Sequence, residues 1–549
     1  MINLPLIASE KPPIPLLPNS LKCSRARAYI SEVRKHAMPG KKHERMGILD
    51  NYRKTIKDNM VVSGSQDSDH HKDPPLVSAL KASAEKNVAS FQFPGHNRGR
   101  AAPSSLSSLI GVRPFLHDLF APKVPILDAE KEAAKLFGAT KTWFLVGGTT
   151  CGIQASVMAT CSPGDTLILP RNSHISVFSS MVLSGAIPKY ITPEYDLEWD
   201  IALGVTTSQA SEAFILLVEK AIGELDTEGR KASAVLVTSP TYYGICSNLE
   251  EISQLCHSHN IPLIVDEAHG AHLGFHENFP LSALHQGADL SIQSTHKVLS
   301  SLTQSSMLHM AGKIVDRERI CRCLQTLQST SPSYLLLASL DAARAQISQN
   351  PETIFNKAVE IALEAKALIE KIPGITVLNS GTFSDVRLWK LGISGFEADV
   401  VLYKDYGVIS ELIGTRSITF AINLGTSRDD VLRLVSGLNH LSQTHNSIGW
   451  KGEKPKPFIE TVGGMRLSPR DAFFASKKKV SFEESIGRIS GELICPYPPG
   501  IPLLIPGEVI TEEAASYLVE VKKKGEFDFE GPVAFDFEGI VVSIYFEKI

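Results

Sequence analysis

The chain has 549 residues, of which 43% are hydrophobic, so it can bury more than one core and exceeds one typical domain. A formal charge of −4 offers no basic surface for nucleic acid, and no apolar run reaches the roughly 18 residues that a membrane span requires. The eight cysteines are scattered through segments with core-like patterns, which favours a reduced compartment over a disulfide framework.

The first 73 residues differ in composition from the rest of the chain. Nine Lys or Arg but only three Glu occur up to residue 45, and prolines cluster between residues 12 and 18. Organelle transit peptides are similarly basic and poor in acidic residues. We therefore interpret residues 1–73 as a largely disordered leader that would direct the protein to a plastid. The alternative is a disordered extension of a cytoplasmic protein.

A first chemical signal lies at residues 143–152. The apolar run Trp143–Val146 predicts a strand that leads through two glycines into a helical pattern. Gly148 would let the backbone approach an anion, the helix N-terminus would attract it, and Thr149 and Thr150 would add hydroxyl donors. An ordinary capped helix has the same pattern, so this signal depends on what accompanies it.

Short β-rich runs then alternate with helical patterns, at residues 166–169, 234–237 and 261–265. This alternation predicts an α/β fold with a mostly parallel, doubly wound sheet. In such a sheet, ligands lie beyond the carboxyl ends of the strands. Gly147–Thr150, Ser239–Thr241 and Asp266 all follow predicted strand ends, so we expect them to converge on one site.

Asp266 and Lys297 together indicate the chemistry of that site. Asp266 ends an apolar run, and Lys297 follows 31 positions later in the cluster Ser294–Ser300. A pyridoxal cofactor needs an acid partner for its ring nitrogen and an amine for its aldehyde. The pair therefore predicts a pyridoxal 5'-phosphate site, and no metal is needed for it.

The segment Asp266–His269 also has the sequence of the metal-binding box of a DEAH-type helicase. That interpretation requires a phosphate-binding loop of the form Gly-x-x-x-x-Gly-Lys-Ser/Thr. No such loop occurs: Gly40-Lys41 and Gly312-Lys313 are followed by Lys42 and Ile314. The missing loop argues against a nucleic-acid enzyme.

Composition divides the rest of the chain into three predicted domains. Residues 74–350 form the predicted major, cofactor-binding domain. After Asn350-Pro351, a helical pattern at 359–371 and a strand pattern at 375–378 predict a smaller α/β domain over 351–462. A segment rich in Pro and Gly at 496–502, followed by strand patterns at 533–546, predicts a C-terminal α+β domain over 463–549.

Several ordered motifs give the chain a family resemblance. They are Phe93–His96, Gly148–Thr150, Arg171–Ser176, Asp266–Gly270, Ser294–Lys297, Ser329–Tyr334, Ser468–Phe474, Pro496–Pro502 and Pro506–Glu508. With them, residues 74–549 resemble the Orn/Lys/Arg decarboxylases, which are fold-type I pyridoxal-phosphate enzymes with an aminotransferase-like architecture. The resemblance is to the short, biosynthetic form without an N-terminal wing domain. It implies decarboxylation of lysine, ornithine or arginine to the amine and CO2, in polyamine or diamine biosynthesis.

The resemblance assigns roles to individual residues. Lys297 would hold the cofactor covalently until the substrate's α-amine displaces it, and Asp266 would keep the ring nitrogen protonated. His174 would stack on one ring face. Ala268, taken as lying on the same strand face as Asp266, would pack on the other. The remaining predicted cofactor contacts are Gly148, Thr149, Thr150, His269, Ser294 and His296.

The resemblance also suggests a substrate contact and a partner. Glu411 resembles an acidic position that follows a strand of the small domain, where its carboxylate would pair with the distal amine or guanidinium of the substrate. The alternative for Glu411 is a solvated strand-end residue. Fold-type I sites form between two subunits, which implies a homodimer, with Ser331 and Ser333 contributed by the partner chain.

Three positions depart from the family pattern, namely Asn97, Gly147 and Ile175. None is the cofactor-binding lysine, the ring-nitrogen acid or the stacking histidine. Two alternatives therefore stay open. An aminotransferase or aldolase would use the same scaffold for another reaction. A cofactor-binding protein without turnover would be consistent with the changes at Asn97 and Ile175.

Overall fold

The computed structural model describes residues 73–85, 124–196, 199, 201–202, 208–351, 353–378, 384–414, 416–445, 464–497, 502–524, 528–530, 535–536 and 539–545. Residues 1–72 of the predicted leader lie outside this range. The motif Phe93–His96 and the departure at Asn97 also lie outside it. Within the described part of the chain, no helix is long and apolar enough to cross a membrane.

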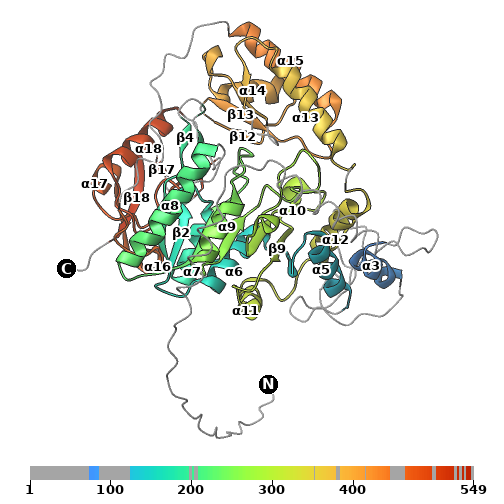
Figure 1. The fold of residues 1–549 in the computed structure, drawn as a ribbon. Coiled ribbons are helices and arrows are strands. Elements are labelled where there is room, and N and C mark those ends of the chain that lie inside the picture. Colours follow the sequence, from blue (N-terminus) through green and yellow to red (C-terminus); the bar gives the residue numbers. More distant parts are fainter. Residues whose placement is uncertain are drawn as a thin grey trace, which may run out of the picture. The chain divides into compact units, whose positions relative to one another are not determined.

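A seven-stranded sheet forms the centre of the first part of the described chain (Figure 1). Its strand order is β1-β9-β8-β7-β6-β2-β3. Strand β9 runs in the direction opposite to the other six strands, which are parallel to one another. The strands are β1 (Lys141–Leu145), β2 (Thr166–Pro170), β3 (Ile187–Ile191), β6 (Ala232–Thr238), β7 (Leu263–Asp266), β8 (Leu290–Gln293) and β9 (Ser306–Met310). The predicted α/β class with a mostly parallel sheet is confirmed.

Helices cover both faces of this sheet, because its strands are apolar on both sides. Along β2, Leu167 and Leu169 pack in one core with α6 (Gly148–Thr160), α7 (Ile175–Ser184) and α11 (Arg317–Leu327). Ile168 faces the opposite core, with α8 (Ser208–Thr227) and α9 (Leu249–Ser258). The other elements here are α3 (Pro75–Glu85), α5 (Val124–Leu136), β4 (Tyr195–Asp196), β5 (Ile201–Ala202), η1 (Leu284–Gln286), α10 (Thr295–Val298) and α12 (Tyr334–Gln349).

A smaller antiparallel sheet follows, with strand order β10-β11-β13-β12. Its elements are α13 (Asn356–Ile369), β10 (Thr376–Val377), β11 (Ser384–Arg387), η2 (Trp389–Leu391), α14 (Gly395–Tyr406), β12 (Leu412–Ile413), β13 (Ser417–Phe420) and α15 (Arg428–Thr444). Capping boxes begin α14 at Ser394 and α15 at Ser427, each satisfying backbone N–H groups of the first turn.

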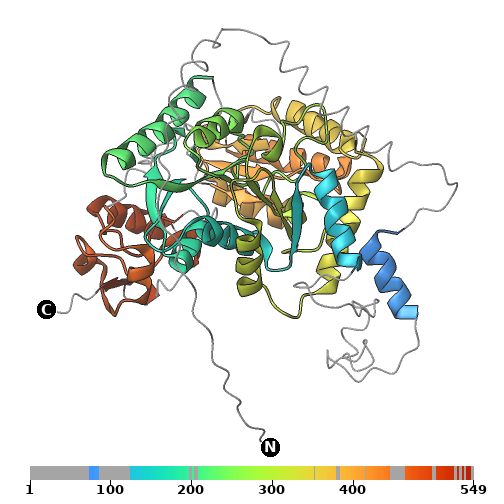
Figure 2. The same ribbon diagram turned by 60° about the horizontal axis from the view of Figure 1, so that its bottom comes forward.

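The last part of the chain is built from short helices and antiparallel strands, as an α+β domain would be. Its elements are α16 (Pro469–Phe474), β14 (Lys477–Ser481), α17 (Phe482–Ser485), β15 (Cys495–Tyr497), α18 (Glu512–Lys524), β16 (Asp528–Glu530), β17 (Phe535–Asp536) and β18 (Gly539–Tyr545). Both views place these elements beside α7 of the major domain (Figure 2), in agreement with contacts between α16 and α7.

Candidate active site

The predicted strand-end residues lie at one edge of the large sheet. Thr238 of β6 pairs with Asp266 of β7, which in turn pairs with Ile292 of β8. The carboxyl ends of these parallel strands are therefore adjacent. Lys297 lies just beyond β8 on the short helix α10, so the topology brings its amine to the end of β7 where Asp266 stands.

Asp266 is a buried carboxyl group, with 3% of the residue exposed. Burial raises the pKa of Asp266 to about 6, against the effects of the Lys297 charge and of a hydrogen bond from the Ala268 N–H at 3.2 Å. Burying a carboxylate is costly unless a positive partner faces it. A protonated pyridine nitrogen is such a partner, so the environment of Asp266 suits the predicted role.

The Lys297 amine lies 3.1 Å from Nε2 of His269. Burial lowers the pKa of Lys297, while the negative charges of Asp266 and Glu411 raise it. A lowered pKa increases the fraction of neutral amine, which is the nucleophilic form. Both carboxylates are therefore close enough to act electrostatically on the amine.

Two histidines and a tyrosine surround this amine. Burial lowers the pKa of His269 well below its ordinary range and that of His174 to about 4, and the Lys297 charge adds to both effects. Both imidazoles are therefore neutral near pH 7. The Tyr242 ring lies edge-on to His269, with centroids 5.3 Å apart, and 6.3 Å from the His174 ring. Tyr242 was not predicted from the sequence, although it directly follows the Ser239–Thr241 segment that was placed at a strand end.

The turn before α6 carries the predicted anion-binding groups. Gly148 has φ +77°, a conformation that favours glycine. The Thr149 hydroxyl contacts the Ser294 hydroxyl and lies 3.1 Å from that of Ser306. Thr150 is exposed in the first turn of α6. Ser306 begins β9 and was not predicted, because nothing in the sequence indicates that an antiparallel strand returns to this edge.

One ring nitrogen of His296 is bonded to the backbone. Its Nδ1 lies 3.0 Å from the backbone oxygen of Ser305, so Nδ1 carries the proton and donates to that carbonyl. This bond fixes α10 to the turn that precedes β9. Ser294 stands at the N-cap position of the same short helix without a side-chain capping bond, and its hydroxyl contacts Thr149 instead, close in sequence to Lys297.

Two predicted positions need correction. Strand β7 ends at Asp266, so Ala268 lies in the following turn and not on a continuing strand face. Glu411 precedes β12 rather than following a strand, and its N–H donates to the Thr419 carbonyl at 2.9 Å. Strand β7 stops at Asp266, and residues 407–410 before Glu411 form no strand. Ala268 and Glu411 nevertheless lie near Asp266 and Lys297, respectively.

Glu267, the second residue of the DEAH-like segment, is fully buried, and its carboxylate is bonded to residues other than Asp266 and Lys297. Its carboxylate accepts bonds from Ser291 Oγ at 2.5 Å, Gln293 Nε2 at 2.9 Å and the Ala283 N–H at 2.8 Å. These bonds attach the end of β7 to β8. Glu267 therefore holds the segment that carries Asp266 and Ala268, and it is not placed to bind a metal.

The departures at Gly147 and Ile175 have simple structural settings. A Cβ at Gly147 would lie 3.1 Å from the Cβ of Cys151, which is a tight contact. Ile175 is the first residue of α7, directly after His174.

Across the described residues, no cluster of three or more His, Cys, Asp or Glu could hold a metal ion.

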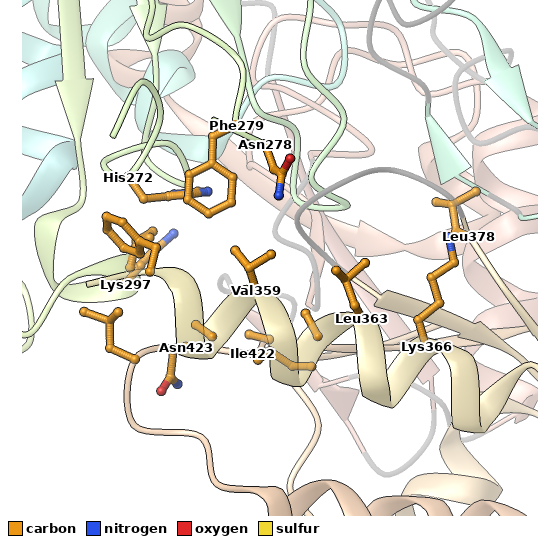
Figure 3. Close-up of a pocket in the computed structure, with 16 residues that line it drawn as sticks. His272, Asn278, Phe279, Lys297, Val359, Leu363, Lys366, Leu378, Ile422 and Asn423 are labelled. Carbon is orange, nitrogen blue, oxygen red and sulfur yellow. The ribbon is translucent and has the colours of Figure 1, made fainter. Parts of the chain in front are cut away.

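A cavity of about 350 Å³ adjoins Lys297 on the side of the small domain (Figure 3). Its walls are mostly apolar and come from α13, the segment 421–424 and the loop that contains His272 and Phe279. Lys366 lines the end opposite to Lys297. Neither Asp266 nor Glu411 lines it, and its cationic residues would repel a basic amino acid. Among the described residues, the cavity therefore offers no carboxylate to pair with the substrate's distal cation.

A buried amine, a buried carboxylate and an anion-binding helix N-terminus, gathered at the carboxyl edge of this sheet, define a fold-type I pyridoxal-phosphate enzyme. Family models match at both domains: the major domain of Orn/Lys/Arg decarboxylases over residues 74–397, and their C-terminal domain over residues 458–540. The chain belongs to the Orn/Lys/Arg decarboxylase family. The predicted enzyme class, an amino-acid carboxy-lyase, is confirmed.

Individual relatives agree with this assignment. An arginine decarboxylase of Halalkalibacterium halodurans is 37% identical over 479 residues, which cover 83% of this chain and 95% of that protein. An arginine decarboxylase of Bacillus subtilis is 36% identical, over 81% of this chain and 92% of that protein. The constitutive lysine decarboxylase of Escherichia coli is 23% identical, over 81% and 76%. These relatives are bacterial, and they give no support to the predicted plastid location.

Solved structures show the same fold. The crystal structure of a Francisella novicida lysine decarboxylase matches with a TM-score of 0.73 at 21% identity, covering 86% of this chain and 81% of that one. The Escherichia coli constitutive lysine decarboxylase matches with a TM-score of 0.72 at 20% identity, covering 86% and 82%.

Proposed function

We propose that this protein decarboxylates arginine, with pyridoxal 5'-phosphate bound at Lys297. The observation that carries the proposal is that the buried Asp266 carboxyl group and the Lys297 amine lie at the adjacent carboxyl ends of β7 and β8, where Asp266 and Glu411 both raise the pKa of Lys297 against the effect of burial. One carboxylate is available for the ring nitrogen and the other for a distal cation. The relatives named arginine decarboxylase, at 36–37% identity, favour arginine over lysine.

Each cofactor contact has a distinct task in this proposal. When bound, pyridoxal phosphate supplies a cationic ring that accepts the electron pair released with CO2. Asp266 keeps the proton on the ring nitrogen. Lys297 would hold the cofactor through its amine, which lies beside Asp266 and His269. The hydroxyls of Thr149, Ser294 and Ser306, with the N-terminus of α6, receive the phosphate.

The ring faces and the substrate engage other residues. His174 would stack on one face as a neutral imidazole, and Ala268 would pack on the other, where its small size leaves room for the ring. His269, hydrogen-bonded to Lys297, would hold that amine toward the reacting carbon. Glu411 would pair with the guanidinium, as a charge-assisted hydrogen bond that orients the substrate. The amine product would supply polyamine synthesis.

The proposed active unit is a homodimer. Ser331 and Ser333 are exposed in the single chain and precede α12, so they are available to a partner subunit. Mixing a Lys297→Ala chain with a Ser333→Trp chain tests this arrangement. Restored activity in the mixture is expected, since one site then has both native contributions. If the two variants sediment as one complex but remain inactive when mixed, the proposal that two subunits share each active site is contradicted.

The function is tested by supplying arginine, lysine and ornithine separately to protein loaded with pyridoxal phosphate. Release of CO2 and formation of agmatine from arginine alone is the expected result. A keto-acid product would instead assign an aminotransferase. A cofactor absorbance band that none of the three amino acids changes would assign a binding protein without turnover.

A further inference from the structure

Arg171 connects the major domain to the C-terminal part of the chain. It follows β2 directly and stands three positions before His174. Its guanidinium is buried, with 2% of the residue exposed, and donates to the carbonyl oxygens of Pro502 at 2.7 Å and Leu503 at 3.1 Å. It also donates to Glu508 Oε2 at 3.0 Å. The segment that presents His174 is thus bonded to residues more than 300 positions away.

Glu508 completes this connection from the C-terminal side. It is fully buried, and its Oε2 accepts a second bond from the Ile505 N–H at 2.9 Å. The same carboxylate oxygen therefore fixes the 505–508 turn and the Arg171 guanidinium. The guanidinium also lies over the rings of Phe178 and Tyr190, with distances of 5.7 and 5.3 Å to their centroids. Such a buried, hydrogen-bonded cation has little freedom to move.

The far end of α7 is held by the same part of the chain. Arg470 of α16 reaches the Leu183 carbonyl in the last turn of α7, with 3.5 Å between the atoms. Ile505 packs in the core that contains Val177 and Phe178 of α7. Figure 1 places α16 next to α7, in agreement with the contacts between these two helices. The C-terminal domain therefore contacts the last turn and the buried side of α7, and it bonds to Arg171, four positions before the helix begins.

His174 depends directly on the position of α7, because it is the N-cap of that helix. Its Nδ1 accepts a bond from the Ser176 N–H at 3.2 Å and lies 2.9 Å from Ser176 Oγ. Nε2 consequently carries the proton of the neutral ring. A shift of the first turn of α7 would move the ring with it.

We infer that the C-terminal domain acts as a brace for the active site: the Arg171–Glu508 pair holds the start of α7 and so positions the His174 ring for cofactor binding. Arg171 and Glu508 are positioning residues, because neither contacts the proposed cofactor site. The role of His174 in this inference rests on the proposed function, whereas the bracing of α7 does not.

The test compares Glu508→Gln with a matched control, Arg344→Met. Arg344 also forms a buried pair, 2.5 Å from Asp341 within α12, and Asp341 accepts a further bond from the Leu76 N–H of α3 rather than from α7. Removing a charge from either pair should lower the unfolding temperature. A loss of stability alone therefore cannot distinguish a brace from an ordinary buried ion pair.

Two further measurements distinguish them. Hydrogen–deuterium exchange on cofactor-free protein should become faster at the first turns of α7 in Glu508→Gln and stay unchanged there in Arg344→Met. Titration with pyridoxal phosphate should give a roughly tenfold weaker Kd in Glu508→Gln and an unchanged Kd in Arg344→Met, as expected when only the first variant loses an indirect support of the site. Arg171→Lys keeps the positive charge but loses the planar guanidinium that donates to several oxygens at once. It should show the faster exchange at α7 and the weaker Kd in milder form.

The outcomes separate the inference from the proposed function. Unchanged exchange at α7 in Glu508→Gln and Arg171→Lys, or equal changes in Arg344→Met, would overturn the brace. If Glu508→Gln does not fold, the same exchange and titration measurements on Arg171→Lys test the inference. Faster exchange at α7 in a protein that binds no pyridoxal phosphate would support the brace and reject the proposed cofactor.

Discussion

Lys297 Nζ and His269 Nε2 lie 3.1 Å apart, although 28 positions separate the two residues in the chain. The contact forms because His269 follows the end of β7 and Lys297 follows the end of β8, and these strands are parallel neighbours. Burial lowers the pKa of both residues, so a neutral imidazole faces the amine. The site thus holds a lysine whose amine is oriented and partly desolvated.

The first prediction concerns the covalent link. Treating the loaded protein with borohydride should fix the cofactor on Lys297, with a matching mass increase on the peptide that contains residue 297. Lys297→Ala should show no increase and no decarboxylation, because no other amine replaces it. Lys366→Ala removes a lysine from the cavity beside the site and should keep the modification. Labelling of Lys297→Ala at another lysine would contradict the assignment.

The second prediction concerns Asp266. Asp266→Asn keeps the shape and the oxygen that accepts the Ala268 N–H, but loses the charge that holds the ring proton. We expect kcat to fall by about 100-fold or more, as for other lost electrostatic partners of a transition state. Asp289→Asn is the control, since Asp289 is a buried carboxylate at the opposite end of β7 that binds the Leu263 N–H at 2.9 Å. Equal losses of kcat in both variants would indicate damage to the sheet.

Part of this site could be predicted from the sequence alone, because it depends on local patterns. Strand-end residues in a parallel sheet converge, so the order of strand and helix patterns is enough to group Asp266, Gly148 and Lys297. The strand limits are harder to predict: the apolar run ends at Val265, and the spacing of two residues from Asp266 wrongly placed Ala268 on a continuing strand, whereas β7 stops at Asp266. Predicted limits for β2 and β6 differ from those observed by one or two residues.

Other features depend on long-range packing that no local pattern encodes. Ser306 reaches Thr149 only because β9 inserts between β1 and β8 in the sheet. The pairing of Arg171 with Glu508 spans 337 positions. In the sequence, nothing distinguishes either residue from a charged residue in an exposed loop. Tyr242 becomes a neighbour of His269 through the turn after β6. These contacts are properties of the tertiary structure.

The third prediction concerns substrate recognition by Glu411. Glu411→Gln should raise the KM for arginine about tenfold or more with a smaller change in kcat, because a hydrogen bond between two charged groups contributes roughly 1.5–3 kcal/mol. Asp405→Asn removes an exposed carboxylate from the same small domain and should leave KM unchanged. An unchanged KM in Glu411→Gln would mean that another group binds the guanidinium.

The fourth prediction concerns pH and His272, a buried residue with 3% exposure whose two ring nitrogens have no hydrogen-bond partner among the described residues. Its ring packs edge-on against Phe279, with centroids 4.7 Å apart. Burial lowers the pKa of His272 from 6.5 to about 4. The unfolded chain therefore takes up a proton at a higher pH than the folded protein does, and stability is lost as the pH falls from about 6.5 to about 4.

Replacing His272 with leucine should remove this contribution, because an apolar side chain of similar size takes up no proton. At pH 5, about 1.5 pH units below 6.5, the wild type should have lost about 2 kcal/mol that His272→Leu retains. Urea unfolding at pH 5 and pH 7.5 measures the difference. His259→Gln, at an exposed position, should follow the wild type at both pH values. Parallel losses of stability in His272→Leu and the wild type would show that the buried imidazole is not the group that responds to acid.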